Sequence, residues 1–248
     1  SYPMYRVSSF QRMLLKEFET YRQTLDTWPA DFSVTYGTIK GSAGAGFEKI
    51  REAADQAAES LGLPCTEQVA GFELSTQKAE AVKPRDGENE KRLTLASLSD
   101  FAEHVELVSG SFPKADSGEP GVLEAMVSTQ AQLKEDLLPG DEYLLPRVLL
   151  DGNTPCTIRI VGTFAPLDEQ ELYWEDWLDA VDNRLYLSEQ AFADTFLGAE
   201  KESLYSLSGR WDYYLDYTRA DVTEVGSLMK QLRQLEKDEL LKGHIKEG

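Results

Sequence analysis

The segment that decides the fold runs from Leu107 to Trp174. It contains, in order, LVSGSFP (107–113), VLEAMVSTQAQLKEDLLPGDEYLL (122–145), CTIRIVGTFAP (156–166) and YW (173–174). Its β-branched runs predict strands at Asp141–Leu150 and Thr157–Phe164. MVSTQAQLKEDL predicts a strand, a hydroxyl N-cap and a short helix, and LYLSEQAFADTFLG (185–198) repeats that order. Short mixed elements of this kind indicate an α+β fold.

This order of parts resembles the extracytoplasmic core domain of MacB/FtsX-type transporter permeases. In that family a Gly-Xaa-Phe/Tyr-Pro turn precedes a strand ending in Val-Ser, a short helix, a Gly-Asp hairpin and a strand reading Val-Gly-Thr/Ile-Phe. The corresponding parts here are Gly110–Pro113, Leu123–Ser128, Gln130–Leu137, Gly140-Asp141 and Ile158–Phe164.

The resemblance implies two subdomains. Residues 1–78 and 203–248 would form a membrane-proximal, porter-like subdomain of βαβ type, residues 79–91 a linker, and residues 92–202 an inserted distal, mixed α/β, sabre-like subdomain. Cys65 and Cys156, about 90 residues apart, would then lie in different subdomains, which favours two separate thiols over a disulfide.

The resemblance also implies a non-catalytic domain on the extracytoplasmic side of the cell membrane, without cofactor or metal. Its partners would be a cytoplasmic ABC ATPase, reached through membrane helices before Ser1 and after Gly248, and a second permease subunit. An extracellular peptide, lipid or protein is a further partner to consider. We therefore expect the chain to be the loop between two membrane helices.

Outside the deciding segment, periodicity predicts helices at Ser8–Leu25 and Phe47–Leu61 and strands at Phe32–Ile39 and Thr66–Ser75. The glycine-rich stretch 41–46 fits no nucleotide fingerprint, so we expect a plain connection there. Further elements are predicted as a helix at Ser99–Val108, a strand at Trp211–Tyr217 and a closing helix from Asp221 through Leu235.

Composition excludes several classes of protein. The formal net charge of −19 argues against nucleic-acid binding, because phosphates would be repelled. The longest apolar run, Tyr143–Leu150, is interrupted by Pro146 and Arg147 and is shorter than the roughly 20 residues that cross a bilayer. The first ten residues lack the apolar core of a signal peptide.

Few residues offer catalytic chemistry. His104 follows Asp100 by four residues on a predicted helix, where a solvated pair explains the spacing, and His244 lies in a polar tail. Asp212 and Asp216 share one face of a predicted strand, as the acids of a glycoside hydrolase could. Strand rise separates them by about 13 Å, so solvent-facing acids are the preferred interpretation.

The most unusual composition lies at Asp168–Asp182, which has seven acids, no base and three large aromatic residues. Aromatic residues beside charges recur at recognition surfaces, which makes this segment a candidate for partner binding through Tyr173, Trp174, Glu175, Asp176 and Trp177. Alternatively, a short helix packs Tyr173, Trp177 and Val181 onto a sheet with its acids in solvent.

Two other functions remain open at this point. The chain could be an extracellular module that senses a peptide or lipid, with the acidic and aromatic segment as its binding surface. It could also be a secreted carbohydrate-active enzyme that uses Asp212 and Asp216.

Overall fold

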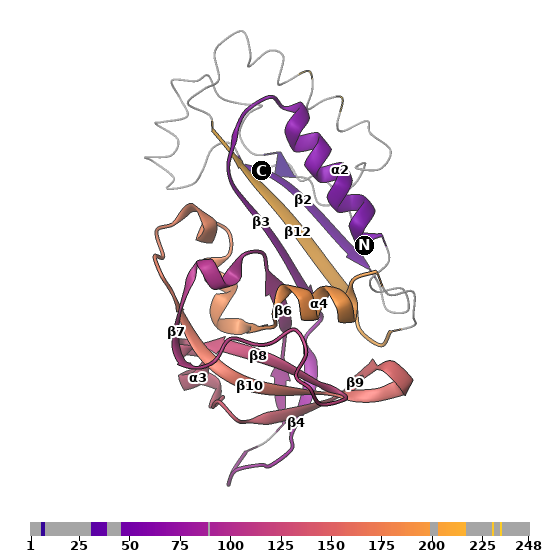
Figure 1. Cartoon of the computed structure of the whole chain (residues 1–248), viewed down its shortest axis with the longest axis vertical. Coiled ribbons are helices and arrows are strands. Elements are labelled where there is room, and N and C mark those ends of the chain that lie inside the picture. The colour runs from indigo at the N-terminus through magenta and orange to yellow at the C-terminus, as the bar shows by residue number, and fades with distance from the viewer. Residues whose placement is uncertain are drawn as a thin grey trace. The chain divides into compact units, whose positions relative to one another are not determined.

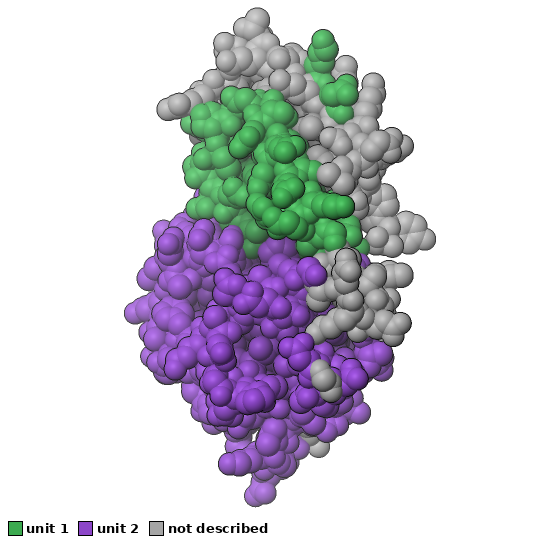
Figure 2. All heavy atoms as spheres, turned by 45° about the vertical axis from the view of Figure 1, so that its right-hand side comes forward, with its two compact units in different colours: residues 1–37, 46–70, 209–248 green, residues 38–45, 71–208 purple. Residues whose placement is uncertain are grey.

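The computed structural model describes residues 6–7, 31–38, 46–88, 90–198 and 203–216, with the isolated helical residues 230 and 234. The chain divides into two compact units, coloured in Figure 2: unit 1 comprises residues 1–37, 46–70 and 209–248, and unit 2 comprises residues 38–45 and 71–208. The helix predicted at Ser8–Leu25 lies outside the described residues, as does nearly all of the predicted closing helix. Within the described ranges, no helix has the length and apolar character that crossing a membrane requires.

Unit 1 is built on a small sheet. Its strands are β1 (Arg6–Val7), β2 (Asp31–Thr38), β3 (Cys65–Leu74) and β12 (Leu207–Leu215), in the order β1-β2-β12-β3, and its helix is α2 (Phe47–Ser60). These bounds confirm the strands predicted at 32–39 and 66–75 and the helix predicted at 47–61. The last residues of β2 and β3 and the first two of β12 belong to unit 2.

Strands β2 and β12 are antiparallel neighbours (Figure 1). The Thr38 hydroxyl donates to the Leu207 carbonyl, and the Phe32 ring lies 5.8 Å from that of Tyr213. Because position 38 faces 207 while position 32 faces 213, the two strands run in opposite directions. The start of β2 therefore lies beside the end of β12.

Helix α2 covers this sheet through one apolar face. Its first turn places Phe47 against Trp211 of β12, with ring centroids 6.3 Å apart, and against Tyr36 of β2 at 4.8 Å. The rest of the buried face is small and aliphatic: Ile50, Ala53, Ala54, Ala57 and Ala58. Small side chains let the helix approach the aromatic residues of the strands closely.

Unit 2 contains a larger mixed sheet. It comprises β4 (Gln77–Ala81), β5 (Lys91–Leu93), β6 (Leu95–Leu98), β7 (Val105–Gly110), β8 (Val122–Ser128), β9 (Glu142–Leu150), β10 (Thr154–Pro166) and β11 (Leu185–Tyr186). From the end of β3 the order is β6-β11-β8-β10-β9-β4-β5, and β7 pairs with β10. The pairs β10·β8 and β11·β6 are parallel, whereas β10 pairs antiparallel with β9 and β7. The predicted α+β class is confirmed.

Two short helices of unit 2 follow the predicted order of strand, cap and helix. Helix α3 (Thr129–Glu135) begins after Ser128, and α4 (Glu189–Phe196) begins after Ser188. In each helix the serine hydroxyl accepts a hydrogen bond from the backbone N–H three residues later, at 3.0 and 3.1 Å. This cap satisfies a donor that the first turn leaves unpaired.

Two glycines of the deciding segment face each other where β7 crosses β10. Gly110 is paired with Gly162, and Gly110 has φ of +73°. A Cβ on Gly162 would lie 2.3 Å from the Ser111 carbonyl oxygen, and one on Gly110 would lie 2.0 Å from that of Val161. Only glycine permits this approach of the two backbones, which gives a physical reason for glycine in both GSFP and VGTF.

Two local predictions differ from the structure. The helix predicted at Ser99–Val108 is wrong, since only one 3-10 turn, η1 (Phe101–Glu103), forms before β7 begins at Val105. Residues 79–91, assigned above to a linker, contain the end of β4 and the start of β5, which pair antiparallel within unit 2. The division into membrane-proximal and distal subdomains stays a prediction.

Candidate functional site

The acidic and aromatic segment forms two short 3-10 helices, η3 (Leu172–Trp174) and η4 (Leu178–Asn183). The packing alternative assumed one short helix, and the structure has two 3-10 helices in its place. Tyr173 and Val181 nevertheless pack inward, with 0% and 3% of their surfaces exposed. The two 3-10 helices bury Tyr173 and Val181, although the prediction placed these residues on one face of a continuous helix.

Trp174 belongs to the aromatic core of unit 2. It is 1% exposed, and its ring contacts Phe101 edge-on at 6.4 Å. Phe101 in turn stacks on Tyr186 at 4.7 Å and meets Phe164 edge-on at 4.8 Å. Trp174 therefore contributes to the packing of unit 2 and offers no surface to a partner.

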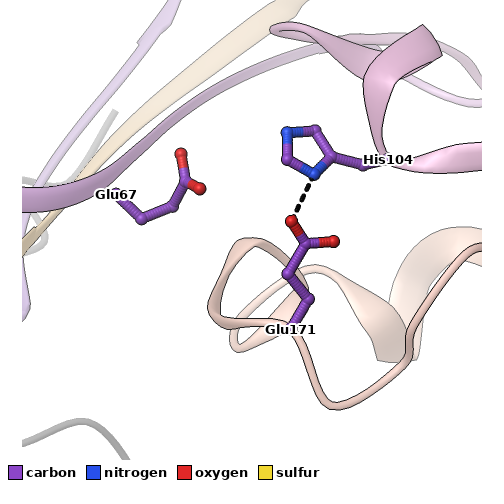
Figure 3. A group of neighbouring side chains, drawn as sticks. All are labelled: Glu67, His104 and Glu171. Atoms are coloured by element: carbon purple, nitrogen blue, oxygen red, sulfur yellow. Dashed lines mark hydrogen bonds and ion pairs between the residues drawn. The ribbon is translucent and has the colours of Figure 1, made fainter.

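Tyr173 is held by a histidine that the sequence assigns to solvent. The His104 ring stacks on that of Tyr173 with centroids 3.7 Å apart, while the Tyr173 hydroxyl donates to the Ser99 carbonyl at 2.8 Å. Figure 3 shows the other contact of His104, in which Nδ1 lies 2.6 Å from Glu171 Oε1. The acid that pairs with His104 is thus Glu171, and the predicted helical pair with Asp100 is wrong.

Of the five residues predicted to bind a partner, only Glu175 is exposed. Trp177 is partly buried, and its ring lies over Gly71 of β3, where a Cβ would be 2.2 Å from the ring. Asp176 is partly buried, and Tyr173 and Trp174 are fully buried. Tyr173 and Trp174 therefore pack against each other in the interior of unit 2, with ring centroids 4.9 Å apart, and Glu175 is the exposed residue of the five.

A second cluster lies where β2 begins and β12 ends. Asp212 is 0% exposed, although the sequence predicts a solvent-facing acid. Ser33 Oγ donates to Asp212 Oδ1, Arg210 Nε lies 2.8 Å from Asp212 Oδ2, and Arg210 Nη2 donates to Oδ1 at 2.9 Å. Asp31 is also buried, with a carboxylate oxygen within 4.8 Å of one of Asp212.

This cluster fastens β2 to β12 through side chains. A buried carboxylate is tolerated when hydrogen bonds and an opposite charge compensate for its lost hydration. Because Ser33 and Arg210 supply both, Asp212 serves as a buried anchor. Enclosed in this way, Asp212 is not available to a polysaccharide, which argues against the carbohydrate-active enzyme considered above.

The same strand also holds α2 by a polar contact. The Tyr213 hydroxyl donates to Asp55 Oδ1 at 2.5 Å, and the other Asp55 oxygen lies 3.0 Å from Arg51 Nη1. Burial, together with the hydrogen bond to Asp55, raises the pKa of Tyr213 far above its ordinary value. The phenol therefore remains a donor at any physiological pH, and the helix stays tied to β12.

The two cysteines are free, as the sequence favours. Cys65 lies exposed at the start of β3, where its thiol donates to the Glu67 carbonyl at 3.1 Å. Partial desolvation and the nearby Glu67 carboxylate raise its pKa. Cys156 is buried in β10, and burial raises its pKa to about 12.

Sequence reasoning missed Asp31, Ser33 and Arg210 as members of the strand cluster. Ser33 and Asp212 are 179 residues apart, so no local sequence pattern predicts their contact. Arg210 offered a weak signal, since it precedes Asp212 by two positions and thus shares its face of an extended strand. Burial of that face was the missing information.

No protein-family model matches the chain, and no curated protein matches it in sequence. Among solved structures, it is similar over 90% of both chains to the periplasmic region of MacB from Actinobacillus actinomycetemcomitans, with 13% identity and a TM-score of 0.39. It is also similar over 85% of both chains to a domain assigned to a permease protein from Porphyromonas gingivalis, with 15% identity and a TM-score of 0.35.

Proposed function

We propose that this chain is the extracytoplasmic domain of a MacB/FtsX-like ABC transporter permease. In this proposal the domain performs no catalysis. It couples ATP hydrolysis by a cytoplasmic ATPase to conformational change outside the membrane, for export or release of a substrate. The motif order from Gly110 to Phe164 is the sequence support for this assignment.

The observation that carries the proposal is the pairing of β2 with β12. Because the strands are antiparallel, the chain enters β2 at Asp31 beside the place where it leaves β12 at Leu215. The segments that precede β2 and follow β12 thus join the sheet at the same end. A domain inserted between two neighbouring membrane helices needs this arrangement.

The Asp212 cluster supports a transmitting role for this end of the sheet. Arg210, Ser33 and Asp212 connect the two strands within a few residues of both connections. Tyr213 then joins β12 to α2 through Asp55. A displacement of either connection would reach the sheet and the helix through these short, charge-assisted contacts.

The proposal includes the subdomain assignment made from the sequence. Residues 1–78 and 203–248 would be membrane-proximal, residues 92–202 distal, and two full-length permease subunits would work together with the ATPase. A contact with an extracellular partner would involve Glu175, the exposed member of the predicted set. Replacing Glu175 with glutamine should therefore weaken binding of a cationic peptide.

The location can be tested with the protein's own thiols. In intact cells that produce the full-length protein, a membrane-impermeant maleimide should label Cys65, which is exposed, and leave buried Cys156 unlabelled until denaturation. A Cys65→Ser variant is the control for background. Labelling of Cys65 that requires permeabilised cells would place this domain inside the cell and contradict the proposal.

The coupling role needs a transport measurement. In proteoliposomes that contain the permease and its ATPase, Arg210→Ala should reduce transport per ATP hydrolysed, because it removes the hydrogen bond from Arg210 to Ser33 of β2 and the cation beside Asp212. Arg159→Ala is the matched control, since Arg159 is equally shielded but pairs with acids at the surface. Equal transport per ATP in both variants would refute coupling through this cluster.

A further inference from the structure

A pocket of about 230 Å³ opens on unit 2, beside the carboxyl end of α3 and the end of η4. Its apolar part consists of Leu93, Ala131, Leu137 and Leu185, each at most 3% exposed. The volume is below the roughly 300–1,000 Å³ of sites for drug-sized molecules. A ligand that fills this pocket is therefore small.

The cationic side of the pocket comes from two arginines. Arg184 is partly committed, because its Nε donates to Glu73 at 2.6 Å. Arg92 is exposed and has no ion-pair partner among the described residues. A free guanidinium binds a carboxylate through two parallel hydrogen bonds.

Two threonine hydroxyls add a donor to the pocket. Thr76 Oγ1 and Thr94 Oγ1 lie 2.8 Å apart, so one donates to the other. The hydroxyl that accepts keeps its own hydrogen, which can be donated to a ligand oxygen.

The acidic residues that line the pocket are Asp182 and the exposed Glu135, and of these Asp182 is the one held by a side-chain hydrogen bond. Its Oδ1 accepts a hydrogen bond from Ser128 at 2.6 Å, whereas its Oδ2 has no partner within the described ranges. Ser128 is the residue that caps α3, so Asp182 is held in place by the helix start. An oriented carboxylate oxygen at the pocket wall is suited to accept from an ammonium group.

Both signs of charge therefore line one small pocket in a chain whose net charge is −19. A simple anion would be repelled by the chain as a whole, and a simple cation would meet two arginines at the pocket. A molecule with both charges satisfies Arg92 and Asp182 together.

We propose that this pocket binds a small zwitterion, an amino acid with a short aliphatic side chain. Its carboxylate pairs with Arg92 and the threonine hydroxyls, its ammonium group with Asp182, and its side chain lies on the apolar floor. The inference is independent of the proposed transporter role, since it concerns binding by unit 2 and makes no use of membrane segments or ATPase.

The test uses the whole chain and L-valine as the probe, followed by methyl NMR of leucines. Saturable shifts are expected at Leu93, Leu137 and Leu185. N-acetyl-L-valine lacks the ammonium group and L-valinamide lacks the carboxylate, so each should bind at least tenfold more weakly. Arg92→Ala and Asp182→Asn should also weaken L-valine binding at least tenfold, and asparagine retains the acceptor for Ser128.

Arg147→Ala is the matched control, because Arg147 is an exposed arginine on β9 outside the pocket. It should bind L-valine like the unchanged chain. The proposal is overturned if L-valine produces no saturable shift up to about 10 mM, or if Arg92→Ala binds as the control does. Equal binding of N-acetyl-L-valine would also overturn it, because the pocket would then select anions and not zwitterions.

Discussion

Replacing Arg210 should damage unit 1 more than replacing its partner Asp212. Arg210→Ala removes the guanidinium beside the Asp212 carboxylate, which is 0% exposed and lies within 4.8 Å of the buried Asp31. Asp212→Ala leaves the Arg210 side chain, which is 26% exposed and can be hydrated. Both substitutions break the contact between Arg210 and Asp212, but only Arg210→Ala leaves the buried Asp212 carboxylate in place.

The expected costs follow from this difference. Removing one partner of a buried ion pair costs about 3–5 kcal/mol when the remaining charge is enclosed, so Arg210→Ala should lie in that range. Asp212→Ala should cost about 1–3 kcal/mol, the loss of hydrogen bonds to a charged group. The double variant should be more stable than Arg210→Ala alone, since it removes the stranded carboxylate.

The assay is urea unfolding followed by far-UV circular dichroism, with peptide-level hydrogen exchange to locate the effect in β2 and β12. Arg159→Ala is the control: its side chain is 25% exposed, like that of Arg210, but its partners Glu119 and Glu142 are 58% and 30% exposed. It should cost less than about 1 kcal/mol. A double variant whose loss equals the sum of the two single losses would refute the argument from a stranded charge.

The remaining predictions concern Gly162, Ser188 and the two cysteines. Gly162→Ala should destabilise the chain by at least about 1–3 kcal/mol in urea unfolding, because its Cβ would lie 2.3 Å from a backbone oxygen; a neutral result would show that β7 can move aside. Ser188→Ala should cost about 1 kcal/mol by loss of the α4 cap, and Ser188→Asp should restore most of it; equal stability of both variants would contradict the cap. Maleimide labelling of Cys65 should be slower at pH 7 than that of an unhindered peptide thiol and should accelerate as pH rises, because the thiolate reacts and the pKa is raised. Cys156, whose pKa is raised to about 12, should stay unlabelled in the folded chain, and rapid labelling of Cys156 would contradict its burial.

Local sequence patterns predicted the elements whose signals are local. Helix α2 has an apolar stripe of Phe47, Ile50 and Ala54, and its bounds agree with prediction to within a residue. The caps at Ser128 and Ser188 were predictable because a hydroxyl before a short helix has one dominant use. Strand β10 was predictable from its β-branched residues.

The elements that failed depend on distant partners. Residues 101–108 carry helix-compatible spacing, but Val105–Gly110 pairs with β10, whose hydrogen bonds outweigh a weak local preference. Strand β12 alternates apolar and acidic residues, which suggests one wet face. It lies between β2 and β3, however, and every residue from Trp211 to Leu215 is buried. Alternation could not reveal that the acidic face is enclosed, nor that Ser33 and Arg210 compensate for Asp212.

The antiparallel pairing of β2 with β12 has a mechanical consequence. Tension that draws the two flanking segments apart would separate β2 from β12 beginning at the end where those segments join. The hydrogen bonds would then break one at a time, so this geometry resists force poorly. Tension applied to both segments in the same direction would leave the hydrogen bonds between β2 and β12 intact, and the two strands would move as one body. The pairing is therefore suited to flanking segments that move together, and the contacts among Ser33, Arg210 and Asp212 lie within a few residues of the end at which the two strands would begin to separate.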